Sequence, residues 1–214
     1  MRAAASIGKG AEAYAMHVKG LELPAYEPRG AKSQGYNYVT ASVGASHCYG
    51  YAGQDIFGAI EPHPTDRFSE ENADVVIYNQ DSTAFKETGI ACGFSGGWGW
   101  VNGFFGKLLA AARGIERFED NAYLMTVGEK LFNLERAFNI REGFGRKQDT
   151  LPKRLLTEPL HTREAPGEGQ MVSHQDKFLD KYYELRGWTK EGIPTAGKLN
   201  ELGLDSVLGD IKVI

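Results

Sequence analysis

Through the second half of the chain, apolar residues recur every three or four positions, the spacing that places them on one face of an α-helix. Prolines and glycines divide this pattern into segments, because proline is favoured in the first turn of a helix and glycine just after the last. The pattern predicts four helices, from Val101 to Gly114, from Leu124 to Gly143, from Ser173 to Gly187 and from Pro194 to Gly203.

Two details of these helices can be predicted from the same pattern. The hydroxyl of Ser173 is placed to cap the third helix, with the acidic Asp176 three residues further on, as in a capping box. The apolar stripe of the second helix is expected to face the core, and it consists of Leu124, Val127, Leu131, Leu134 and Phe138.

The first half of the chain is less regular. Residues 7–18 and 72–87 have helical composition, whereas the pattern of residues 31–43 is ambiguous. Prolines and glycines predict loops at residues 61–64 and 157–170. Because alternating strand patterns are scarce throughout, we expect an all-α fold made of an irregular set of helices.

Composition is that of an ordinary globular protein. The 214 residues suffice for one domain or two small ones, and 42% hydrophobic with 24% charged residues excludes a disordered or fibrous chain. A net charge of −4 without a basic stripe argues against nucleic acid as a partner. The sequence has neither an apolar run of about 18 residues nor the apolar core of a signal peptide. We therefore expect a cytoplasmic protein without a membrane partner.

Glycine is unusually frequent, with 27 residues, and it is concentrated around one cysteine. Seven glycines lie between Gly89 and Gly106, in a segment that also holds Cys92, Trp98 and Trp100. Such a segment forms either a tight turn between helices or a backbone cradle around a large anionic or planar ligand. It is not a phosphate-binding loop, since no Gly-Lys-Ser/Thr follows.

Few side chains offer recognisable chemistry. Cys92, in a glycine-rich turn, suits an iron–sulfur ligand, although a small buried hydrophobe is the common alternative. Glu87 either contacts a cofactor amine or ends a solvated helix face. His47 suits proton transfer if it faces a reactive centre, and is otherwise a hydrogen-bonded loop residue. Its neighbour Cys48 does not strengthen the case for a metal site, because adjacent side chains rarely point into one site.

Charged residues in the second predicted helix suggest packing rather than catalysis. Glu135 and Arg136 flank the apolar stripe and are expected to form a partly buried ion pair. Arg141, Arg146 and Lys147 are expected to form a solvated basic face.

Several stretches, distributed in order along nearly the whole chain, match one known family. They are His17–Gly30, Gly44–His47, Cys92–Phe94 with Trp98, Phe132–Gly143, Asp149–Arg154, Tyr182–Trp188 and Gly192–Thr195. Together they resemble the C-terminal part of the tungsten-dependent aldehyde:ferredoxin oxidoreductase family.

The resemblance implies a specific chemistry. Enzymes of this family hold tungsten through two pyranopterin cofactors beside a 4Fe–4S cluster, and they oxidise aldehydes to carboxylic acids with ferredoxin as electron acceptor. Their helical C-terminal domains close over one pterin. His47 matches the histidine of the family's Gly-Ala-Cys-His-like stretch near tungsten, which makes it a candidate for proton transfer.

A second family motif, Asp-x-x-Gly-Leu-Cys, contacts pterin and supplies the fourth cluster cysteine. Aligned on its cysteine, the motif makes Cys92 the cluster ligand and puts Glu87 in the acidic, pterin-contacting position. The match departs from the motif, because Glu replaces Asp, Ile90 replaces Gly and Ala91 replaces Leu. We expect Gly89 to act for the missing glycine one residue earlier.

The family's Cys-x-x-Cys-x-x-x-Cys group and its N-terminal cofactor-binding β domain have no counterpart in residues 1–214. We therefore expect the C-terminal helical part of a larger enzyme, whose partner is the N-terminal portion, and which alone binds no cofactor and oxidises no aldehyde. Two alternatives stay open. One is a related tungsten enzyme that reduces an aromatic acyl-CoA or carboxylic acid, and the other is a non-catalytic helical interaction module that has lost the cofactor.

Overall fold

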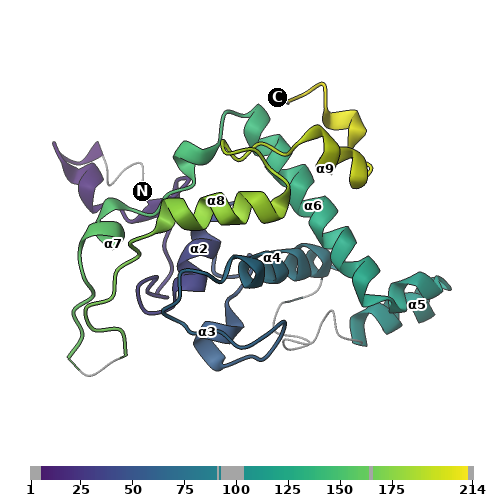
Figure 1. The fold of residues 1–214 in the computed structure, drawn as a ribbon, viewed down its shortest axis with the longest axis horizontal. Helices are drawn as coiled ribbons and strands as arrows, with labels where there is room; N and C mark the ends of the chain where they lie inside the picture. The colour runs from purple at the N-terminus through teal and green to yellow at the C-terminus, as the bar shows by residue number, and fades with distance from the viewer. Residues whose placement is uncertain (1–5, 91, 93–103, 164–165, 212–214) are drawn as a thin grey trace.

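The computed structural model describes residues 6–90, 92, 104–163 and 166–211. Short 3-10 turns occur at Ala11–Tyr14, Glu116–Glu119, Arg146–Gln148 and Asp205–Val207, and β1 (His17–Val18) pairs antiparallel with β2 (Leu21–Glu22). The α-helices are α2 (Lys32–Thr40), α3 (Gly53–Phe57), α4 (Ala73–Glu87), α5 (Phe105–Arg113), α6 (Asn121–Arg141), α7 (Lys153–Thr157), α8 (Gln175–Arg186) and α9 (Ala196–Glu201) (Figure 1). The predicted all-α class is confirmed, with one small hairpin added.

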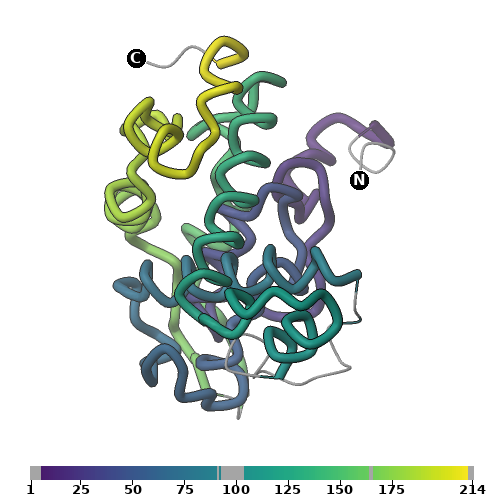
Figure 2. The backbone as a smooth tube through the Cα atoms, turned by 90° about the vertical axis from the view of Figure 1, so that its right-hand side faces the viewer, coloured from purple at the N-terminus to yellow at the C-terminus, as the bar shows by residue number. Residues whose placement is uncertain are grey.

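Helix α6 is the longest element and organises the others. It crosses α4, while α2 and α8 pack against α4, and the C-terminal segment with α9 lies along the end of α6 (Figures 1 and 2). The main core gathers rings from several of these helices. Tyr36 of α2 stacks on Phe178 of α8 with ring centroids 3.6 Å apart, and Phe132 of α6 stacks on Trp188.

The crossing of α4 and α6 depends on a glycine. A Cβ atom on Gly128 would lie 1.9 Å from the backbone oxygen of Asp81, so no larger residue fits there without moving a helix. Beside this crossing, Arg186 is fully buried and its Nη1 lies 2.6 Å from the Asp81 carboxylate. The backbones of α4 and α6 therefore approach as closely as glycine allows.

The predicted buried stripe of α6 is partly wrong. Leu134 and Phe138 are 40% and 55% exposed, whereas the polar Asn133 and Arg136 are buried. These polar residues can point inward because each has a partner, and Asn133 accepts a hydrogen bond from Trp188 Nε1 at 2.7 Å. The apolar pattern alone does not reveal such partners.

The structure decides the predictions that were open in the first half of the chain. Within the ambiguous segment 31–43, residues 32–40 form α2, and the helix predicted over residues 72–87 is confirmed as α4. The helix predicted over residues 7–18 is wrong, since this segment holds only a 3-10 turn and strand β1. Gly10 there adopts a left-handed φ of +86°, which interrupts a helix.

Helix ends follow the predicted glycines but not the predicted cap. Gly114 and Gly187 adopt left-handed angles directly after α5 and α8. The cap predicted at Ser173 is wrong, because α8 begins after His174. The backbone amides of Ser173 and His174 instead donate to the carboxylate of Glu70, whose pKa falls to about 2 through hydrogen bonds that outweigh its burial.

The loops predicted at residues 61–64 and beyond Thr157 contain no helix or strand among the residues described there. Across the described part of the chain, no helix combines the length and the apolar character needed to cross a bilayer.

The close approach of α4 and α6 is tested by a pair of glycine substitutions. We expect Gly128→Ala to lower the free energy of unfolding by at least about 2 kcal/mol, because the new methyl group meets backbone rather than a movable side chain. Gly197, in α9, is the matched control, since its Cβ would meet nothing closer than 4.0 Å. Gly197→Ala should raise stability by about 0.5–1 kcal/mol. Urea titration of both variants measures the difference, and equal effects would contradict the packing described.

Candidate functional site

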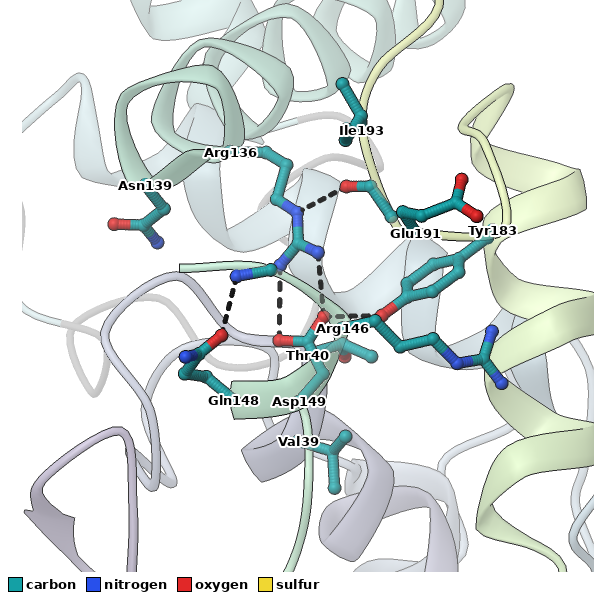
Figure 3. A network of polar contacts seen from close by, with 12 residues as sticks. Val39, Thr40, Arg136, Asn139, Arg146, Gln148, Asp149, Tyr183, Glu191 and Ile193 are labelled. Atoms are coloured by element: carbon teal, nitrogen blue, oxygen red, sulfur yellow. Dashed lines mark hydrogen bonds and ion pairs between the residues drawn. The ribbon is translucent and has the colours of Figure 1, made fainter. Parts of the chain in front are cut away.

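A buried carboxylate joins segments from four parts of the chain. The Asp149 side chain is 0% exposed, and its Oδ1 lies 2.8 Å from Lys19 Nζ. Its Oδ2 lies 2.8 Å from Arg136 Nη2 (Figure 3). The Tyr183 hydroxyl donates to it at 2.5 Å. Burial alone would raise the pKa of Asp149, but Lys19 and Arg136 together hold it below its ordinary value. The carboxylate is therefore ionised and fully partnered.

The same network reaches the loop that carries His47. Lys19 also donates to the backbone oxygens of Val39 and Ala41, at 3.1 Å for the latter, and so satisfies carbonyls at the C-terminal end of α2. Lys19 adopts a left-handed φ of +51°, which is uncommon outside glycine. Its ammonium group thus links Asp149 to the point where the loop begins.

The expected ion pair between Glu135 and Arg136 is not formed. Arg136 turns inward to Asp149, and its Nε donates to the backbone oxygen of Gly192 at 2.8 Å. Glu135 accepts hydrogen bonds from the hydroxyls of Ser42 and Tyr49. Adjacent helical residues point about 100° apart, so they serve different neighbours.

The loop of residues 41–50 is confined at two glycines, by neighbouring backbone at Gly44 and by buried side chains at Gly50. Gly44 (φ +91°) leaves no room for a side chain, because a Cβ would lie 2.3 Å from the oxygen of Val18. Gly50 (φ +101°) is equally confined, with its Cβ position 2.5 Å from Oδ1 of Asn37. Between them, Asn37 Nδ2 donates to the backbone oxygen of Ser46 at 3.2 Å. These contacts fix the backbone of the loop in one position.

His47 is half-buried on this loop, among aromatic rings. Its ring lies 5.4 Å from that of Tyr26 and 6.2 Å from that of Tyr51, and these two tyrosines pack edge to face at 5.3 Å. Burial, followed by the hydrogen bond to Tyr26, raises the pKa of Tyr51. Neither tyrosine was identified from the sequence, because both come from loops without a periodic pattern.

Contrary to expectation, His47 and Cys48 do point toward one another. Nε2 of His47 lies 3.2 Å from Sγ of Cys48, a distance typical of a hydrogen bond that involves sulfur. The loop backbone, fixed between two glycines, brings these adjacent side chains to the same side.

Glu87 and Cys92 lie at and just beyond the C-terminal end of α4, and both are exposed. Glu87 is within electrostatic reach of the His47 loop, since it adds to the larger effects of burial and Glu135 that raise the pKa of Tyr49. An exposed carboxylate and an exposed thiol at a helix end fit one edge of a cofactor site, the former as a hydrogen-bond acceptor and the latter as a metal ligand.

The turn before Cys92 has a backbone that usually requires glycine. Ile90 is 95% exposed and adopts φ +51°, a genuine outlier for a β-branched residue. This is the position at which the family motif has glycine. Gly89 does not act in its place, because its own requirement comes from packing. A Cβ there would lie 2.0 Å from the ring of Phe105.

Within the described ranges, no group of three or more His, Cys, Asp or Glu side chains is close enough together to hold a metal ion. Ala91 and the glycine-rich segment 93–103, with Trp98 and Trp100, lie outside the described residues.

The expected basic face is only partly solvated. Arg141 and Lys147 are exposed, but Arg146 lies 2.6 Å from the carboxylate of Asp180 and over the ring of Tyr183. Its role is to attach the segment after α6 to α8.

The chain matches a known class of helical oxidoreductase domain. A family model described as aldehyde ferredoxin oxidoreductase, domains 2 and 3, matches residues 1–204. The chain belongs to this family.

Individual relatives agree with this assignment. A tungsten-containing aldehyde ferredoxin oxidoreductase from Pyrococcus abyssi is 40% identical over 91% of this chain and 32% of its own length. The protein of the same name from Thermococcus kodakarensis is 37% identical over the same shares. The chain thus spans about a third of the length of the curated relatives it matches.

A solved structure supports the fold. The active site complex BamBC of benzoyl coenzyme A reductase, in complex with 1,5-dienoyl-CoA, superimposes with a TM-score of 0.65 at 24% identity. The match covers 96% of this chain and 35% of that chain.

The left-handed turn at Ile90 is tested by restoring glycine. We expect Ile90→Gly to raise the free energy of unfolding by about 1 kcal/mol, because a side chain at positive φ costs about 1–2 kcal/mol. Ile115 is the matched control, since it is also exposed but has φ −116°. Ile115→Gly should lower stability by about 0.5–1 kcal/mol. Guanidinium titration distinguishes the two, and a loss of stability in both variants would contradict a left-handed Ile90.

Proposed function

We propose that residues 1–214 form the C-terminal helical part of a cytoplasmic tungsten–pterin enzyme that oxidises aldehydes to carboxylic acids, with ferredoxin as electron acceptor. The observation that carries the proposal is the sequence identity of 37–40% with four archaeal proteins that bear this name, over 88–91% of the chain. A match over this share of the chain spans the region from the His47 loop to the end of α4 with Cys92.

The partner of this chain is the N-terminal portion of the same enzyme. The relatives are about three times as long as the segment they share with this chain, which supports a further part that supplies the β domain and most cofactor ligands. The described residues offer one exposed thiol and one exposed carboxylate at the end of α4, too few ligands for a cluster. The chain alone is therefore inactive.

Cys92 and Glu87 serve the cofactors in this proposal. The Cys92 thiolate is the fourth ligand of the 4Fe–4S cluster, and the Glu87 carboxylate accepts hydrogen bonds from pterin amines. The left-handed backbone at Ile90 supports both assignments, because glycine, the residue that the family motif has at this position, readily adopts such an angle.

His47 moves a proton. When bound, the tungsten–pterin group and the cluster supply the two-electron oxidation and carry the electrons toward ferredoxin. Oxidation of an aldehyde with water to a carboxylic acid also releases two protons, of which a neutral imidazole near the substrate can accept one while the other passes to water. The anchored loop of residues 41–50 suits this task, because a general base must be held at a fixed, short distance from the reacting group.

Two other functions are separable from this one. A tungsten enzyme that reduces an aromatic acyl-CoA or carboxylic acid would share the fold, but the relatives with higher identity carry the aldehyde name. A helical interaction module without cofactor would need neither His47 nor Cys92.

The proposal is tested by assembling this chain with the N-terminal portion of a family member and measuring tungsten content and aldehyde-dependent reduction of a viologen dye. We expect activity with aldehydes and none with acyl-CoA thioesters. His47→Ala should lower kcat by about 100-fold with tungsten unchanged, since it removes only the proton acceptor. Lys9→Ala, in the exposed N-terminal segment, is a control that should change neither value.

Thioester reduction without aldehyde oxidation would replace the proposal by the reductase alternative. An assembly that binds no tungsten would support the interaction module instead.

A further inference from the structure

Cys48 is the residue of the His47 loop to which the proposed function gives no role. Its Sγ lies 3.2 Å from Nε2 of His47, and its side chain is exposed. The family stretch that matches Gly44–His47 ends at its histidine. The resemblance therefore assigns no role to Cys48, the residue that follows.

The chemistry of the two groups decides which one donates. A neutral imidazole carries one N–H donor and one strong nitrogen acceptor, whereas a thiol is a weak donor and its sulfur a weak acceptor. A hydrogen bond from the thiol S–H to Nε2 therefore uses the stronger of the two acceptors. A hydrogen bond from the ring N–H to sulfur would use the weaker one. With Nε2 accepting, the ring proton must lie on Nδ1, because the hydrogen bond at one nitrogen fixes the tautomer of the other.

The surrounding structure keeps this contact in place. The loop is confined at Gly44 and Gly50, and Asn37 donates to the backbone directly before His47. The ring itself is flanked by Tyr26 and by Tyr51, whose centroids lie 5.4 and 6.2 Å away. A ring enclosed in this way has little freedom to turn its Nε2 from the sulfur.

We propose that Cys48 is a positioning residue that holds His47 as the Nδ1–H tautomer by donating its thiol proton to Nε2. The consequence for catalysis rests on the proposed function. If His47 exchanges a proton with substrate, the exchanging atom is Nδ1, since Nε2 is engaged by Cys48. The tautomer itself does not depend on that function.

The tautomer can be measured directly on the 214-residue chain by nitrogen-15 NMR of the histidine side chains, at about pH 8, where an ordinary histidine is neutral. We expect a pyrrole-type Nδ1 and a pyridine-type Nε2 for His47. In Cys48→Ala the two resonances should exchange character toward Nε2–H, the tautomer that histidine favours in water. Cys48→Ser, which retains a donor, should preserve the Nδ1–H form.

Cys92→Ala is the matched control, because it removes the other exposed cysteine and should leave the His47 resonances unchanged. Unchanged signals of His63 and His161 report that the fold is intact. An Nε2–H tautomer in the original protein, or the same tautomer with and without the Cys48 sulfur, would overturn the inference.

The assembled enzyme separates this inference from the proposed function. Cys48→Ala should lower kcat at unchanged KM, and Cys48→Ser should restore it, a pattern that a merely structural role would not produce. If the original enzyme oxidises no aldehyde while the NMR result holds, the proposed function fails and the positioning role of Cys48 stands.

Discussion

The arrangement of this chain depends most on the interactions of the buried Asp149 carboxylate. It is fully buried, yet it contacts Lys19 from the N-terminal hairpin, Arg136 from α6 and Tyr183 from α8. Removal of such a partner leaves buried cations uncompensated, which typically costs about 3–5 kcal/mol. Since the groups come from distant parts of the sequence, the network also specifies which segments meet. The hairpin, the central helix and the C-terminal helices are fixed relative to one another through one carboxylate.

This constraint extends to the chemistry. Lys19 binds Asp149 with the same ammonium group that satisfies carbonyls at the end of α2, where the His47 loop begins. From the other side, Asn139 of α6 donates to the backbone oxygen of Ser42 at 2.8 Å. A rigid support of buried charges therefore carries a half-buried histidine, while Cys92 stays exposed beyond α4. In the proposed function, this division leaves the cysteine accessible to the N-terminal portion of the enzyme.

The sequence predicted the helical class, the main helices and the ends marked by Gly114 and Gly187, because these depend on local periodicity and backbone freedom. It failed where tertiary partners decide. Arg136 is buried only because Asp149 lies opposite, thirteen positions along the chain, and no local pattern shows that pairing. Candidate residues came chiefly from family resemblance. The contact of Cys48 with His47 and the left-handed angle of Ile90 needed the three-dimensional structure.

In the proposed function, this chain supplies one cysteine to a cluster shared with the rest of the enzyme. The most direct measurement is the iron content of the assembled enzyme, with the electron paramagnetic resonance signal of its reduced cluster, for Cys92→Ala and Cys48→Ala side by side. Both cysteines are exposed, so general effects of removing a thiol should be equal. We expect loss of iron and of the cluster signal in Cys92→Ala alone. Full iron and an unchanged signal in Cys92→Ala would contradict it.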